Sequence, residues 1–130
     1  MATSKVVTKE LQEHVEKLIK KVTLETTAEL IEATPVDTGW ARANWVPNIN
    51  ERFDKTAGTR QNAERGTVDI SAQQQGKIDV LIRYKLPDTI FVSNNVEYIS
   101  ALNDGHSLQA PAGFVQQSIA KAIQNVSSGG

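Results

Sequence analysis

The sequence predicts a single α+β domain, in which a long N-terminal helix, a middle helix and a C-terminal helix pack against a small antiparallel or mixed sheet. Apolar residues recur every three or four positions near both ends of the chain, which is typical of amphipathic helices. Two short runs, at 43–50 and 89–93, have the alternating or β-branched character of strands. A chain of 130 residues is long enough to form one core, and it shows no internal repeat and no sign of a second domain, so 1–130 is taken as one domain.

Composition restricts the classes of function. The chain is 39% apolar and 22% charged, as expected for a globular protein, and its net charge of -1 gives no overall field that would attract nucleic acid or an anionic membrane. It contains no cysteine, which excludes disulfides, thiolate metal sites and thiol nucleophiles. No segment approaches the roughly 18 apolar residues of a membrane span, and none looks like a signal peptide. We therefore expect a soluble protein that is made and used in the cytosol, or that is built into a structure assembled there.

The first helix is expected over 8–33, with Thr8 as its N-cap. One apolar stripe runs along it through Leu11, Val15, Leu18 and Val22. Carboxylates crowd the negative end of its dipole at Glu25, Glu29 and Glu32. Two interpretations stay open for them: a solvated acidic face, which we favour, or contact with a basic group of this chain or of a neighbour.

Pro35 ends this helix, because proline disfavours the helical conformation at the preceding residue. The segment 36–39 is then expected to turn sharply into a strand, with Asp37 accepting hydrogen bonds inside the turn and Gly39 taking a positive φ. We favour this structural role for the motif over direct contact with a partner.

The strand at 43–50 is expected to have an apolar face, and Pro47 restricts it to the edge of the sheet. Its other face would carry Asn44, Asn48 and Asn50. Trp45 lies on the apolar face and is the core candidate, whereas Trp40, beside the turn, is a candidate anchor for a neighbouring subunit.

The segment 50–66 is rich in charged and polar residues and has one large apolar side chain, Phe53, which predicts a long mobile loop. Its basic residues are candidates for a DNA channel or for docking on an acidic neighbour, although acidic residues dilute their field: Arg52, Lys55, Arg60 and Arg65. The segment 71–83 fits either a strand or a helix, and we choose the helix.

After a turn at Pro87, 89–93 is expected to be the buried central strand, and 96–103 to hold one helical turn that presents Tyr98 and Leu102 to the core. The last helix is expected over 114–126, with an inward face formed by Phe114, Ile119, Ala122 and Ile123. The ends, 1–7 and 127–130, are expected to be flexible.

Three segments together resemble one family. They are 34–39 followed by 41–45, 88–95 with Tyr98, and 103–107 with 109–114, and their order and spacing are similar to those of the neck or tail-completion (head-tail joining, minor tail) proteins of long-tailed bacteriophages. The resemblance covers the chain from the first helix to the last. It departs from the family at Trp40, where a basic residue is common, at Glu97, where proline is common, and at His106, where an aromatic residue or serine is frequent.

The resemblance implies a structural subunit of the virion neck that catalyses nothing and binds no cofactor. It implies a homo-oligomeric ring, six-fold or twelve-fold, between connector or stopper proteins on the head side and tail tube or terminator proteins on the tail side. Genomic DNA would pass through the ring without sequence-specific binding. A tail terminator ring and a head-side stopper ring remain alternatives. The implied motif or interface residues are Asp37, Gly39, Trp40, Arg42, Trp45, Asn94, Asn95, Tyr98, Asp104, Gly105, His106, Gln109, Pro111 and Gly113.

An enzyme or a regulatory binding module is a more remote alternative. The two histidines are His14, expected on the solvated surface, and His106, which with Asp104 and a distant Asp37 would make a metal or acid-base group. The sequence holds no metal-ligand repeat, nucleophile elbow, phosphate loop or dinucleotide turn. A non-viral module on the same scaffold would be recognised by a gene neighbourhood without portal, capsid and tail genes.

Overall fold

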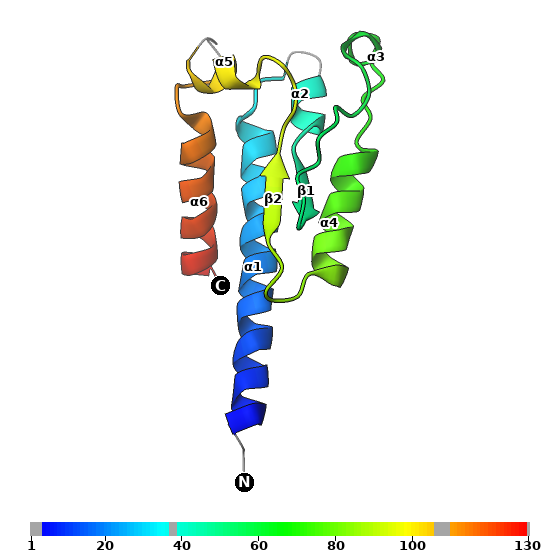
Figure 1. The fold of residues 1–130 in the computed structure, drawn as a ribbon. Helices are drawn as coiled ribbons and strands as arrows, with labels where there is room; N and C mark the ends of the chain where they lie inside the picture. Colours follow the sequence, from blue (N-terminus) through cyan, green and yellow to red (C-terminus); the bar gives the residue numbers. More distant parts are fainter. Residues whose placement is uncertain (1–3, 37–38, 106–109, 130) are drawn as a thin grey trace.

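The computed structural model describes residues 4–36, 39–105 and 110–129 and confirms the α+β class. Its long helix α1 lies at the centre of the molecule, with α6 on one side and a two-stranded sheet backed by α4 on the other (Figure 1). The short helices α2, α3 and α5 gather at one end, and the N-terminal half of α1 extends beyond the body at the opposite end (Figure 1). The elements are α1 (Ser4–Ala33), α2 (Trp40–Ala43), β1 (Val46–Ile49), α3 (Arg60–Glu64), α4 (Ser71–Arg83), β2 (Ile90–Ser93), α5 (Ile99–Asn103) and α6 (Phe114–Gly129).

The sheet pairs β1 and β2 antiparallel, from Val46 opposite Ser93 to Ile49 opposite Ile90. Because the described residues contain two strands, each strand has a free edge, and the prediction of an edge strand containing Pro47 is confirmed. The prediction of a buried central strand at 89–93 is wrong, since β2 is mostly half-buried and has no strand on its second side.

The middle segment is a helix, as chosen from the sequence, and α4 lies against β1. The two approach very closely at Gly76, where a Cβ atom would overlap the carbonyl oxygen of Pro47. Gln73, Gly76 and Val80 form the buried side of α4. The alternation that had suggested a strand arises because apolar residues occupy the outer side of this helix as well.

The core lies where the upper half of α1 meets β1, β2 and the start of α6. One cluster of buried residues within it consists of Leu30, Trp45, Ala110 and Phe114, so Trp45 is the core residue that the sequence predicted. The partly buried side chains packed around them are Ile31, Ala33, Val92, Ile99, Leu102 and Val115.

Several predicted boundaries are wrong. Helix α1 begins at Ser4, so Thr8 lies inside it and is not its N-cap, and α6 continues to Gly129 where a flexible end was expected after 126. Ala43 belongs to the short helix α2, and the strand that was expected from 43 begins at Val46. The segment 50–66 is not a loop throughout, because it contains α3.

On α6, Phe114 and Ala122 are buried as predicted, but Ile119 and Ile123 are exposed to 40% and 50% and do not face inward. Helix α6 is therefore apolar over a wider arc than the side that packs against α1. The predicted apolar stripe on α1 faces solvent at Leu11, Val15 and Leu18.

Candidate interaction site

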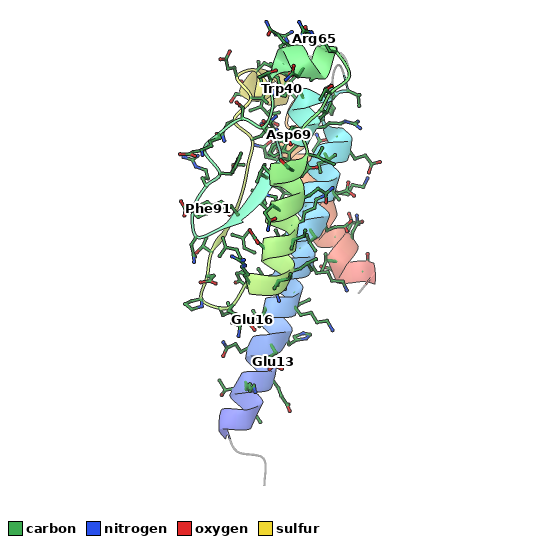
Figure 2. The ribbon with its side chains drawn as sticks, turned by 90° about the vertical axis from the view of Figure 1, so that its right-hand side faces the viewer. Glu13, Glu16, Trp40, Arg65, Asp69 and Phe91 are labelled. Carbon is green, nitrogen blue, oxygen red and sulfur yellow. The ribbon has the colours of Figure 1, made fainter. Side chains whose placement is uncertain are left out.

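Two regions are candidates for function. The first, called here the motif end, consists of α2, α3, α5 and the segment 94–98, where segments far apart in the sequence meet (Figure 1). The second consists of the apolar surfaces that α1 and α4 leave exposed. The two regions lie toward opposite ends of the molecule. Figure 2 shows Trp40 and Arg65 near the motif end and Glu13 on the projecting part of α1.

At the motif end, Gly39 has a φ of 85°, which confirms the predicted positive φ at the entry to α2. The ring of Trp40 contacts that of Tyr98 at 6.2 Å between centroids, and the guanidinium carbon of Arg60 lies 5.9 Å above Tyr98. Trp40 also donates from Nε1 to the carbonyl oxygen of Ala57 at 3.0 Å. It is half-buried, so part of this predicted anchor already serves the subunit's own packing.

Asn94 joins the end of β2 to α2. Its Nδ2 donates to the carbonyl oxygen of Ala41 at 2.8 Å, and its Oδ1 accepts from the amide of Val96 at 3.0 Å. The neighbouring Asn95 donates to the carbonyl oxygens of Phe53 and Lys55. These two predicted site residues therefore tie distant segments of backbone together.

Asn44 is a residue that the sequence reasoning missed. Its side chain is 1% exposed, accepts from the amide of Ala57 at 2.6 Å, and donates to the carbonyl oxygens of Ala57 and Trp40 at 3.2 and 2.8 Å. Asn44 had been placed on the outer face of a strand. The sequence does contain a signal for the burial of Asn44. Two small residues, Ala41 and Ala43, precede it in α2, and small residues allow a short helix to pack closely against its neighbours.

These contacts also correct the view of 50–66 as a mobile loop. Ala57 and Ala63 are buried, and the segment is fastened to the body by Asn44 and Asn95. Its predicted basic residues stay on the surface, where Arg60 pairs with Glu64 at 3.3 Å; the exposed set is Arg52, Lys55, Arg60 and Arg65.

Arg42 completes the C-terminus of α1. Its Nε donates to the carbonyl oxygen of Thr34 at 2.6 Å and its Nη2 to that of Glu32 at 3.0 Å, which satisfies carbonyl groups that a helix end leaves without partners. The indole Nε1 of Trp45 donates to the hydroxyl of Thr34 at 2.8 Å. Both motif residues thus serve the internal structure.

The third motif segment fixes the start of α6. The amide of Gly113 donates to the carbonyl oxygen of Asn103 at 2.7 Å, and the side chain of Asn103 accepts from the amide of Val115 at 3.0 Å. Gly105 and Gly113 have φ of 91° and 75°. Of the other predicted residues here, Asp104 and Pro111 are exposed, whereas Asp37, His106 and Gln109 lie outside the described residues.

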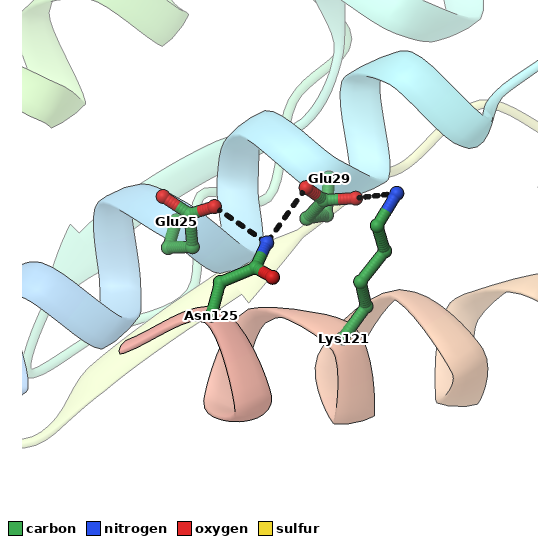
Figure 3. A network of polar contacts seen from close by, with 4 residues as sticks. All are labelled: Glu25, Glu29, Lys121 and Asn125. Atoms are coloured by element: carbon green, nitrogen blue, oxygen red, sulfur yellow. Dashed lines mark hydrogen bonds and ion pairs between the residues drawn. The ribbon is translucent and has the colours of Figure 1, made fainter. Parts of the chain in front are cut away.

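The acidic end of α1 has a partner within the chain. Lys121 Nζ lies 3.3 Å from a carboxylate oxygen of Glu29, and Asn125 donates to Glu25 and Glu29 (Figure 3). For Glu29, the interpretation that a basic group of the same chain contacts the acidic residues is confirmed. Glu32 is exposed, as the interpretation of a solvated acidic face predicts.

Among the residues that the structure describes, two ionisable groups have shifted pKa values, and neither lies at the motif end. Burial raises the pKa of Tyr84, and the negative charges of Asp88 and Glu16 raise it further. The hydroxyl and the backbone amide of Ser71 lower the pKa of Asp69, which precedes α4. His14 is exposed, as expected. Among the described residues no three His, Asp or Glu side chains are grouped so that they could hold a metal ion.

The comparisons with known proteins add no identification. Neither family models, nor curated proteins, nor solved structures give a match to this chain. No helix in the described part of the chain has the length and apolar character needed to span a membrane. A function for this chain is therefore inferred from its residues and their contacts.

Proposed function

We propose that the chain is a structural subunit of a bacteriophage neck, which assembles into a ring that joins the DNA-filled head to the tail. The observation that carries the assembly part of the proposal is the amount of exposed surface. The chain exposes 8341 Å², whereas a compact monomer of its mass would expose about 6,800 Å². The excess of roughly 1,500 Å² is close to what two standard interfaces cover on one partner, at about 800 Å² each.

A ring subunit makes two such interfaces, one with each neighbour. The exposed surface that favours this arrangement is also apolar, since large side chains stand out on α1, α4 and α6. An isolated subunit with this surface would be prone to association, whereas assembly would remove the surface from water.

The neck part of the proposal is supported by the resemblance of the three motif segments to neck and tail-completion proteins. Asn94 bonds the second of these segments to the first through the carbonyl oxygen of Ala41, and Asn103 bonds the third to the start of α6. A rigid end of this kind suits a subunit that must present fixed loops to proteins above or below it. In the proposal these partners are connector or stopper proteins on the head side and tube or terminator proteins on the tail side, and DNA passes through the ring.

Electron microscopy of virions that lack this protein tests the proposed function. A nonsense mutation in the gene, with the wild-type gene supplied on a plasmid as the control, should yield filled heads and separate tails that fail to join. The plasmid should restore joined particles. Normal virions with packaged DNA and attached tails in the absence of the protein would refute a neck role.

A further inference from the structure

Two apolar surfaces of this chain are left uncovered by the chain itself. The first, called here the stripe, runs along the projecting half of α1 and consists of Val7, Leu11, Val15 and Leu18, which are 47%, 61%, 39% and 41% exposed. The second, called here the ridge, lies on α4 and consists of Ile78, Leu81 and Ile82, which are 46%, 52% and 71% exposed. Contiguous exposed apolar residues on a folded domain mark interaction surfaces.

The stripe continues the side of α1 that α6 covers. Leu18 precedes Glu25 by seven residues, which is two helical turns, and Glu25 accepts a hydrogen bond from Asn125 of α6. Leu18 and Val126 line one pocket, three residues before α6 ends at Gly129. On the sheet side, Glu16 still accepts a hydrogen bond from the amide of Leu86, and toward its N-terminus α1 projects beyond the rest of the molecule (Figure 1). The stripe therefore continues the side of α1 that binds a helix, but no helix of the described chain covers it.

The ridge faces away from the body. Gly76 and Val80 hold α4 against β1, and Ile78 and Ile82 each follow them by two residues, which is about 200° around a helix. Helices α4 and α6 flank α1 on opposite sides (Figure 1). The ridge of a subunit consequently cannot reach the stripe of the same subunit.

We propose that the ridge of one subunit packs onto the stripe of the next, so that α4 takes the place along the projecting half of α1 that α6 holds farther up. This inference rests on the proposed function and identifies its subunit interface. The occupant is a second copy because the exposed apolar side of α4 matches the stripe in length. The ridge itself spans about 6 Å, but Ile70, which is 46% exposed and directly precedes α4, lies on the same side three helical turns before Leu81. From Ile70 to Ile82 this side extends about 18 Å, and from Val7 to Leu18 the stripe extends about 17 Å.

The contact is heterologous, because the two surfaces differ and lie on different sides of the subunit. Such a contact repeats from one subunit to the next until the rotation closes a ring. If α1 paired with α1 of a second copy, the contact would bury the stripes of both subunits and leave both ridges exposed. The head-to-tail contact buries one ridge and one stripe for each subunit, which accounts for both surfaces.

Engineered cysteines test this geometry directly, since the chain contains none. Leu11→Cys and Ile82→Cys are made separately, and each purified protein is treated with a short bismaleimide crosslinker, alone and as an equal mixture. Covalent dimer should form in the mixture and in neither protein alone. The double variant should give a ladder of covalent oligomers that ends at the size of the ring.

Efficient crosslinking of Leu11→Cys alone would mean that α1 pairs with α1, and it would overturn the proposal. Failure of the mixture to crosslink while light scattering detects oligomers would place the interface elsewhere. A wild-type protein that remains monomeric at every attainable concentration would overturn it as well. Circular dichroism before crosslinking establishes that each variant is folded, and both cysteines replace side chains that are exposed in the subunit.

Charge variants provide a second measurement. Leu11→Glu and Ile82→Glu should each weaken assembly about tenfold or more, because either one places a carboxylate in a contact without water. Val36→Glu is the matched control, since Val36 is 55% exposed and follows the opposite end of α1. A control that weakens assembly as strongly as the other two would contradict the assignment.

These experiments use purified protein and no virions, so they fail independently of the neck role. Subunits that assemble without the ridge and stripe, together with virions that cannot join without the protein, would refute this interface and leave the proposed function standing. If the protein crosslinks head to tail but virions join without it, the interface would stand and the neck role would be refuted.

Discussion

The motif end and the projecting half of α1 use their side chains in opposite ways. At the motif end, polar side chains are turned inward and bonded: Asn44 alone makes three hydrogen bonds at 1% exposure. On the projecting half of α1, apolar side chains such as Leu11 are turned outward. The first region is stabilised within the subunit, whereas the second is left for a contact that the subunit alone does not make.

This difference separates stability from assembly. Substitutions at the motif end should lower the free energy of unfolding of the subunit, because buried polar groups lose their partners. Substitutions on the stripe or the ridge should leave that free energy nearly unchanged and weaken association. Substitutions in the two regions, each compared with a matched variant, test whether stability and assembly divide in this way.

Trp45→Ala should have the largest effect. Trp45 is in the core, and its loss removes a large buried side chain and leaves the hydroxyl of Thr34 without its donor. Truncation of a buried tryptophan costs about 3–5 kcal/mol in the free energy of unfolding. Urea denaturation followed by circular dichroism measures it.

Trp40→Ala is the matched comparison, because Trp40 is half-buried and begins the short helix α2, which ends just before Trp45. The monomer should remain folded and lose less than half of what Trp45→Ala loses. If Trp40 also anchors a neighbour, as the sequence predicts, analytical ultracentrifugation should show weaker assembly. A loss of stability equal to that of Trp45→Ala would make Trp40 a core residue.

Asn44→Ala should cost about 1–3 kcal/mol, since it leaves the buried amide of Ala57 without its acceptor, whereas the carbonyl oxygen of Ala57 keeps the hydrogen bond from Trp40. Proteolysis should then cut 50–66 faster than in the wild type, because this segment loses one of its ties. Asn48→Ala is the control: Asn48 lies on the neighbouring strand β1 and is half-buried. If the two variants lost the same free energy of unfolding, the hydrogen bonds of Asn44 would not be a special source of stability.

Arg42→Ala should cost about 1–2 kcal/mol, because the carbonyl oxygens of Glu32 and Thr34 at the end of α1 lose their donors. Thermal unfolding is the measurement. Arg52→Ala, at an exposed position, should have almost no effect. If instead Arg42→Ala left stability unchanged and abolished assembly, Arg42 would be an interface residue as the resemblance implies.

The helices were predictable because their periodicity is a local property of the chain. Residues 71–83 formed the chosen helix, and Trp45 took its predicted place in the core. Periodicity does not say which of two apolar sides faces the core. For that reason Ile119 and Ile123 were assigned inward, although the structure exposes both.

The site was only partly predictable, because its bonds join residues far apart in the sequence. Asn94 and Ala41 are separated by 53 residues, and no local pattern shows that they meet. Asn44 was missed because two-residue alternation placed it outside, whereas α2 turns the chain before β1 begins. The close approach at Gly76 is equally invisible in sequence, since a glycine inside a helix gives no indication of what lies against it.

The smallest predicted effect concerns Tyr84, which is 3% exposed and lies close to the base of the projecting helix, where Glu16 accepts a hydrogen bond from the amide of Leu86. Burial raises the pKa of Tyr84 above its ordinary 10.0, and the charges of Asp88 and Glu16 add to the effect. The folded state therefore holds this proton more tightly than the unfolded chain. Its contribution to stability is complete below pH 10.0 and declines as the pH rises from there through the raised pKa.

Tyr84→Phe removes this contribution, so the free energy of unfolding should fall less steeply with pH above 10.0 than in the wild type. The difference between the two slopes cannot exceed about 1.4 kcal/mol per pH unit, which corresponds to one proton. Urea titrations at a series of alkaline pH values give both slopes, and lysine ionisation cancels between the two proteins. Identical slopes would mean that the ring reaches water and that the base of the projecting helix is open, in which case the contrast between a packed body and a bare helix would begin higher along α1.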